Sequence, residues 1–247
     1  MKTSIFIMTF LMSVVTSYAQ DATAIVQKAN DLVMGKTSKG LMTMTIERPT
    51  WSRTVSMKSW SQGNDYYLIL ITEPARDKGQ VFLKRNTDMW NWMPTISRMI
   101  KIPPSMMSQS WMGSDFTNDD LVKMNSIVED YTHKIIGDEK IGGYDCHKIE
   151  LIPKENAAVV WGKIIMWIDK SEYFEMKMEY FDEDMNLVNT QTASNVTQFG
   201  DRKLPAHLEM IPADKEGHKT ILDMKDMEFN TDIPESFFSQ QNMKRVK

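Results

Sequence analysis

The stretch of residues 87–121 reads TDMWNWMPTISRMIKIPPSMMSQSWMGSDFTNDDL, and it decides the fold expected for the whole chain. Its first part predicts a β-hairpin over 88–102, because two apolar runs flank a proline turn at Pro94. Pro103 and Pro104 then end the second strand, since neither residue can donate a hydrogen bond to a strand ladder.

The segment that follows, Pro103 to Gly113, is a candidate lid with an apolar underside. It alternates large apolar residues with Ser and Gln. Met107 and Trp111 are four residues apart, so they would share one face of a helix. An ordinary surface loop with two buried anchors explains the same composition, and the sequence leaves both interpretations open.

Outside this stretch, the hydrophobic pattern predicts one helix followed by strands. Residues 21–34 carry one apolar stripe of helical period, with Asp21 or Thr23 as a cap and Gly35 as an end. From residue 40 the period changes to two, which is typical of strands. Strands are expected over 41–46, 51–58, 65–72, 80–84, 127–136, 145–153, 163–169, 174–181, 187–196, 204–210 and 220–229.

The fold class expected from this order is mainly β (α+β), an open or half antiparallel barrel of about eleven strands. Strands in nearly unbroken hairpin order curl into such a barrel. A sheet of this length has to bury the apolar side chains of its inner face. The helix at residues 21–34 and the candidate lid are the elements available to cover the concave side.

Composition limits the classes of partner. The chain has 247 residues and a net charge of −4, without a basic run, so we expect no nucleic-acid partner. Methionine is abundant, at 22 residues. Because its side chain is unbranched and adaptable, methionine is over-used at sites that bind varied apolar ligands. A core that is simply rich in methionine is the alternative.

The first 19 residues predict a signal peptide, and residues 20–247 a single domain. Lys2 precedes an apolar run, and Ser17 and Ala19 form a small-x-small cleavage site. No later stretch approaches the roughly 18 apolar residues of a membrane span. The protein is therefore expected to be exported and soluble. Cys146 is the single cysteine, so neither an internal disulfide nor a cysteine metal site is expected.

No catalytic constellation is visible, which favours a binding protein over an enzyme. A G-x-S-x-G motif is absent, and the four histidines are scattered without metal-ligand spacing. We therefore expect no metal and no cofactor. A curved sheet lined by apolar side chains can instead hold an acyl chain. Burying each methylene is worth about 0.8 kcal/mol, so a sixteen-carbon chain gains on the order of 12 kcal/mol before ordering costs.

The candidate site residues form two groups. Apolar residues expected to line or cover the cavity are Trp90, Trp92, Met106, Met107, Trp111, Met112 and Phe116. Arg98 and Lys101 carry the charges of the second hairpin strand, and their spacing places them on opposite sides of it. One of them is expected to contact a lipid phosphate or an acidic patch of a partner. For the apolar group, the alternative is a filled core without a cavity. For Arg98 and Lys101, the alternative is a solvated strand face.

The hairpin and the segment after it resemble a known family. A tryptophan-bearing strand, a proline turn, a basic return strand and then MGSDFTNDDL (residues 112–121) are similar to the outer membrane lipoprotein-sorting proteins, which are LolA-like periplasmic carriers. The match covers about 35 residues. It departs from the family pattern at Asn118, where an aromatic residue is common, and at Met93, where leucine is expected.

The resemblance implies a LolA-like half-barrel in the periplasm that binds the acyl chains of a lipoprotein or another lipid. Such a carrier would receive its cargo from an inner-membrane exporter of the RND or ABC type and would act as a monomer. A periplasmic lipid-sensing or interaction module that regulates a membrane partner is the competing class. An enzyme acting on a lipid would need a nucleophile beside a base, and the sequence offers none.

Overall fold

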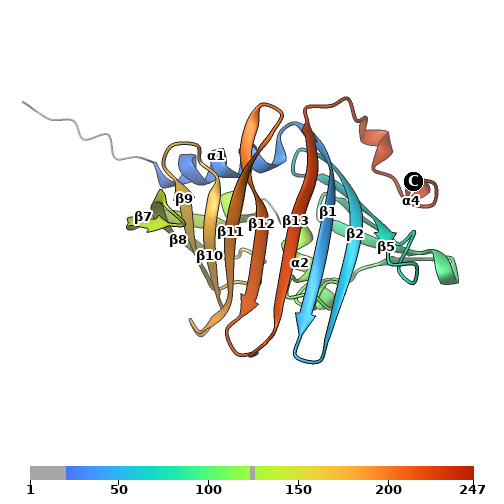
Figure 1. Cartoon of the computed structure of the whole chain (residues 1–247), viewed down its shortest axis with the longest axis horizontal. Coiled ribbons are helices and arrows are strands. Elements are labelled where there is room, and N and C mark those ends of the chain that lie inside the picture. The colour runs from blue at the N-terminus through green and yellow to red at the C-terminus, as the bar shows by residue number, and fades with distance from the viewer. Residues whose placement is uncertain (1–20, 123–125) are drawn as a thin grey trace, which may run out of the picture.

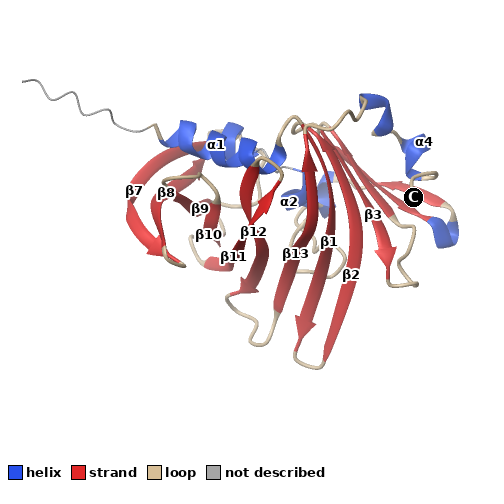
Figure 2. Cartoon of the chain, turned by 45° about the horizontal axis from the view of Figure 1, so that its top comes forward, coloured by secondary structure: helices blue, strands red, loops and turns tan. Residues whose placement is uncertain are grey.

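A computed structural model describes residues 21–122 and 126–247, and its main feature is one open antiparallel sheet of thirteen strands. The sheet curves strongly, and its two halves enclose a concave side (Figures 1 and 2). The expected signal peptide lies outside the described residues. In the described ranges, each helix is too short or too polar to span a bilayer.

The strands run in the order β6-β5-β4-β3-β2-β1-β13-β12-β11-β10-β9-β8-β7, so β6 and β7 are the two edges. The strands are β1 (Thr37–Arg48), β2 (Trp51–Gln62), β3 (Tyr66–Glu73), β4 (Val81–Arg85), β5 (Asp88–Met93), β6 (Arg98–Lys101), β7 (Tyr131–Ile141), β8 (Tyr144–Pro153), β9 (Lys163–Asp169), β10 (Glu175–Phe181), β11 (Leu187–Phe199), β12 (Arg202–Pro212) and β13 (Lys219–Phe229). The α-helices are α1 (Ala22–Met34), α2 (Asn118–Val122), α3 (Ser126–Glu129) and α4 (Gln240–Met243).

Helix α1 confirms the helix expected at residues 21–34. The carboxylate of Asp21 accepts a hydrogen bond from the backbone N–H of Thr23 at 2.9 Å, which caps the first turn. Gly35 ends the helix at a φ of 63°, a left-handed conformation that favours glycine. The buried face of the helix packs against the β7–β12 half of the sheet, where Ile25 and Val26 join the core.

The sheet has thirteen strands rather than about eleven, because the hairpin over 88–102 extends it. Strand β5 pairs with β4, with Trp90 opposite Leu83, and β6 pairs with β5. The hairpin therefore continues the curved sheet as its edge. The expected strand at 127–136 also begins later, at Tyr131, because residues 126–129 form α3 and turn Ile127 toward the core.

Two apolar cores fill the concave side. The first, which we call the α1 core, lies between α1 and strands β7–β12 and includes Ile149, Leu151 and Ile164. The second, which we call the lid core, lies against β1–β5 and includes Met44, Val55 and Ile71. Phe116 packs against both cores. The boundary between the two cores is where a cavity can form.

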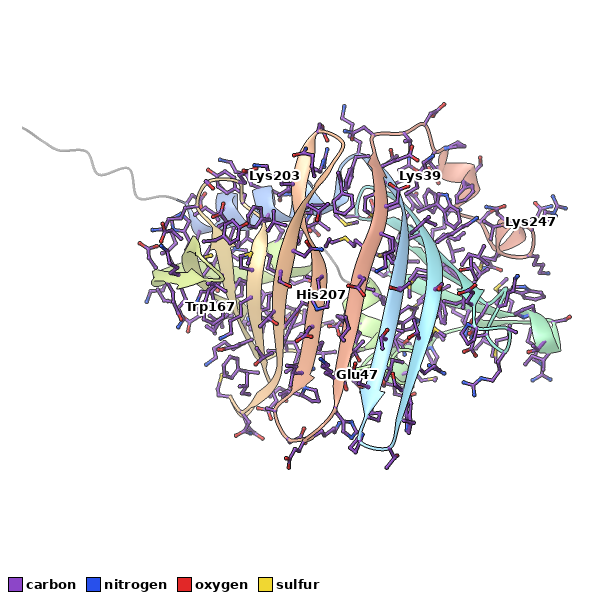
Figure 3. The ribbon with its side chains drawn as sticks, viewed as in Figure 1. Lys39, Glu47, Trp167, Lys203, His207 and Lys247 are labelled. Atoms are coloured by element: carbon purple, nitrogen blue, oxygen red, sulfur yellow. The ribbon has the colours of Figure 1, made fainter. Side chains whose placement is uncertain are left out.

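The convex side carries different chemistry in its middle and at one end. Across β12, β13 and β1 it is polar, with His207 Nδ1 2.7 Å from Asp223 Oδ1 and Lys219 Nζ 3.1 Å from Glu209 Oε1 (Figure 3). Toward the β6 edge, the C-terminal residues 233–246 cover an apolar surface of β3–β6. We call this surface, together with the C-terminal residues that cover it, the outer aromatic cluster. Its aromatic members are Trp60, Tyr66, Trp90, Trp92, Phe237 and Phe238.

We predict that Gly162→Ala destabilises the fold by about 1–3 kcal/mol in urea unfolding, because there is no room for a side chain. A Cβ there would lie 2.4 Å from the carbonyl oxygen of Asp182 and 2.8 Å from the Cα of Glu183. Gly137→Ala is the control, since its Cβ meets nothing within 4 Å. Equal stability of the two variants would contradict the packing described at Gly162.

Candidate ligand-binding cavity

A cavity of about 310 Å³ lies on the concave side, between the two cores. Helix α1, helix α2 and the lid segment (Pro103 to Gly113) contribute to its walls, together with strands from both halves of the sheet. Ligand-binding pockets commonly range from about 300 to 1,000 Å³ and are mostly apolar. Size and position therefore make this cavity the candidate site.

One wall of the cavity is rich in methionine. Seven residues that line the cavity as a whole are methionines: Met34, Met42, Met44, Met57, Met178, Met224 and Met227. Most belong to β1, β2 and β13, where the alternation of the strands turns them inward; Met42, for example, lies opposite Met57. Because the methionine side chain is flexible and polarisable, this wall can adapt to apolar ligands of different shape.

The opposite wall, formed by α2 and β9–β11, carries polar groups. Asp120 accepts hydrogen bonds from the backbone N–H of Thr117 at 2.7 Å and from the indole N–H of Trp161 at 3.1 Å. Burial raises the pKa of Asp120. Asp119 and Tyr131 also line the cavity on this side. Lysine, arginine and histidine are absent from the lining in the part of the chain that the structure describes.

Glu175 lies on this polar wall because of a β-bulge. The pairing between β10 and β9 shifts between Glu175 and Lys177, so that Glu175 lies opposite Ile168 and Lys177 opposite Trp167. A bulge re-aims the side chain next to it. Glu175 consequently faces the cavity with Met178, whereas Lys177 lies over the ring of Trp167 on the outer face.

The carboxylate of Glu175 accepts a hydrogen bond from the amide of Gln191 at 2.6 Å. Gln191 stands on β11 and is itself only 8% exposed. Burial of the Glu175 carboxyl raises its pKa to about 7. The pKa of the neighbouring phenol of Tyr180 is also raised. Burial is the largest cause, and the negative charges of Glu175 and Asp120 raise this pKa further.

An arginine on β1 anchors the far end of the lid segment. Arg48 contacts both carboxylate oxygens of Asp115 at 3.1 Å and donates to the carbonyl of Gly113 at 2.8 Å. Thr220 also donates to Asp115, at 2.7 Å. The side chains of Arg48 and Asp115 are 10% and 7% exposed, so this bidentate pair is shielded from water. Arg53 adds a contact to the carbonyl of Met112.

The lid segment is a series of turns rather than a regular helix. A single 3-10 turn, η2 (Pro104–Met106), is followed by irregular backbone, and the amide of Asp119 at the start of α2 donates to the carbonyl of Met107 at 2.9 Å. Trp111 is 3% exposed and meets the ring of Phe82 edge-on, with centroids 5.3 Å apart. The segment is thus held against the concave face by an apolar anchor and by backbone hydrogen bonds.

The structure separates the residues that the sequence analysis grouped as the lining of one site. Trp111 and Phe116 line the cavity, while Met106, Met107 and Met112 pack against the lid core beside it. Trp90 and Trp92 lie elsewhere, in the outer aromatic cluster. They alternate with the inward-facing Met89, so the period of two places them on the other face of β5.

The two basic residues lie outside the cavity lining, both exposed on β6. Lys101 is on the outer face, 2.8 Å from Asp88 and over the ring of Trp90. Arg98 pairs with Met93 and has the opposite orientation in the strand. Arg98 and Lys101 therefore point to opposite faces of β6. Contact with a phosphate or with a partner stays a prediction for either residue.

Sequence reasoning missed Glu175, Gln191 and Asp120. In the sequence, residues 175–181 (EMKMEYF) alternate cleanly, so Glu175 reads as one of three outward polar residues. The bulge that turns it inward has no clear signature there. Asp120 could have been suspected from the spacing of Thr117 and Asp120, which is typical of a helix start. In the described residues, no group of three His, Cys, Asp or Glu is placed to hold a metal ion.

The architecture and the cavity define a class of protein, an open β half-barrel with a mainly apolar cavity on its concave side. A family model described as an uncharacterized protein matches residues 63–245. No curated protein matches the chain. The chain belongs to a LolA-like family, as this family model and two solved structures indicate.

The first of these structures, from Vibrio parahaemolyticus, is a domain named for outer membrane lipoprotein sorting. It is 29% identical, with a TM-score of 0.80 over 91% of this chain and 98% of that one. The second is a LolA superfamily protein from Nitrosomonas europaea, 25% identical, with a TM-score of 0.77 over 91% and 100% of the two chains. A DUF1329 family protein from Desulfovibrio piger, 22% identical over 90% and 97%, has the same fold with a TM-score of 0.82.

We predict that Arg48→Lys loosens the lid segment. Lysine provides a point charge in place of the planar fork that contacts both oxygens of Asp115. Hydrogen–deuterium exchange should become faster at residues 103–117, and the free energy of unfolding should fall by about 1–3 kcal/mol. Arg98→Lys, on an exposed strand edge, is the control and should change neither quantity. Unchanged exchange at 103–117 in Arg48→Lys would show that the arginine does not hold the segment.

We predict a pH-dependent effect of Glu175→Gln on the stability of lipid-free protein. The pKa of Glu175 rises from 4.5 to about 7 on folding, so ionisation of Glu175 lowers the stability of the folded state. This loss of stability is absent below about pH 4.5 and complete above about pH 7. The variant should be more stable than the wild type by about 1–3 kcal/mol at pH 8 and equally stable at pH 4. Urea unfolding at both pH values tests this, and a gain of the same size at pH 4 would contradict it.

Proposed function

We propose that this protein is a periplasmic carrier that holds the acyl chains of a lipoprotein or another lipid in its concave cavity. It would receive this cargo from an inner-membrane exporter of the RND or ABC type and carry it, as a monomer, toward the outer membrane. The observation that carries the proposal is the apolar cavity between the two cores, covered by the lid segment. The proposed activity is binding and transfer, without a catalysed reaction.

The free energy gained by burying an acyl chain is large, so a carrier needs a controlled way to release its cargo. Each methylene that enters the cavity contributes about 0.8 kcal/mol, so even six of them contribute about 5 kcal/mol before ordering costs. Cargo held in this way leaves slowly unless the site opens. The contacts of Arg48 with Asp115 and Gly113 fasten the end of the lid segment and are the contacts that opening would break.

Native mass spectrometry tests the proposal directly. Full-length protein, expressed and processed in its own host, is purified without detergent, and its bound molecules are extracted with organic solvent. A carrier should retain a species in the mass range of a lipid or a lipidated peptide. Transfer of that species to acceptor vesicles should follow. A ligand-free mass, together with no uptake of added fatty acid, would contradict the proposal.

We predict that Leu222→Trp blocks ligand uptake by filling the cavity. Leu222 lines the cavity and lies opposite Met44 and Leu208, so a larger side chain there takes up the space of an acyl chain. Uptake of a fluorescent fatty acid should fall at least tenfold, a change of about 1.4 kcal/mol in binding free energy.

The matched control for this variant is Ile221→Trp, one residue away on the outer face of β13, opposite Thr45 and Glu209. It should leave uptake unchanged. Equal uptake by the two variants, both folded by circular dichroism, would place the ligand outside the cavity.

A further inference from the structure

The polar wall of the cavity carries Glu175, a carboxyl group that the fold places there at a cost in free energy. A carboxyl group taken out of water is unfavourable unless its charge is compensated. Glu175 accepts one hydrogen bond, from Gln191, whereas an ionised carboxylate can accept about four. In the described residues, no cation lines the cavity to compensate Glu175.

The orientation of Glu175 is specified by the backbone rather than by chance. The bulge between Glu175 and Lys177 turns Glu175 inward. Without the bulge, regular alternation would place it on the outer face with Lys177 and Glu179, which form an ion pair at 2.6 Å. Bulges often occur beside functional sites. Gln191, on the next strand, then fixes the rotamer of the carboxylate.

The two ends of the cavity differ in polarity, so they can orient a ligand. Glu175 stands near Asp120 and Tyr180, on the side of the α1 core. The opposite side is lined by Met44, Met57 and other members of the lid core. A ligand with one polar end and one apolar tail would place its tail under Trp111 and its polar end against β10 and β11.

We infer that Glu175 and Gln191 form a head-group site for an apolar ligand whose polar end is an amine, which donates hydrogen bonds and is positively charged. This inference rests on the proposed function, because it concerns the ligand of the same cavity. An ammonium group has three hydrogen-bond donors, and it supplies a positive charge that compensates the negative charge of Glu175. A carboxylate or phosphate head group would meet Glu175 and Asp120 as like charges.

A displacement assay with matched single-chain ligands tests the inference. Full-length protein is delipidated and loaded with Nile red, a neutral apolar fluorophore, at pH 8. Dodecylamine, dodecanol and dodecanoate, each below its micelle concentration, then compete for the cavity. The wild type should bind the amine at least about tenfold more tightly than the carboxylate, with the alcohol between them.

Two variants on the same strand separate the head-group site from general effects. Glu175→Gln keeps the shape and an amide partner for Gln191 but removes the charge, so it should lose about tenfold of amine affinity and keep alcohol affinity within about threefold. Glu179→Gln, on the outer face of β10, should match the wild type in every competition.

The outcomes distinguish this inference from the proposed function. If none of the three ligands displaces Nile red, the proposed acyl-binding function is wrong. If all three bind with equal affinity, or the wild type prefers the carboxylate, the cavity binds chains and the head-group inference alone is overturned. The wild-type ranking decides this even if Glu175→Gln does not fold.

Discussion

The structure depends on the requirement that a long curved sheet bury its concave apolar face. A closed barrel would meet this requirement by itself, but this sheet ends at two separate edges, β6 and β7. Helix α1 and the lid segment therefore take over the burial, each on its own half. Because two separate elements cover one face, they leave the space between the two cores as a cavity.

The contact between Arg48 and Asp115 links this requirement to the proposed carrier function. The lid segment is held by the apolar anchor Trp111 and, beyond its end, by a shielded bidentate ion pair. Apolar contacts are non-directional, whereas the ion pair has a defined geometry that is either made or broken. A cover fastened in this way can have two states, closed over a ligand and open for its release. This is what a carrier of a strongly bound lipid requires.

Much of the fold could be predicted from the sequence, and the site could be predicted less well. The period of two identified the strands, and Asp21 and Gly35 bounded the helix. Which face of the hairpin is concave could not be read from local pattern, because it depends on the C-terminal residues that cover Trp90 and Trp92. The bulge at Glu175 was missed for a related reason: pairing register is a property of two strands together.

The central claim is that the acyl chain enters the concave cavity and not the outer aromatic cluster. Photo-crosslinking with a diazirine-bearing fatty acid, followed by peptide mapping, tests it most directly. An acyl chain in the cavity should place the labels in β1, β2 and β13, at the methionines that face the cavity. Labels concentrated at Trp90, Trp92 and residues 233–246 would contradict it and would assign ligand binding to the convex side.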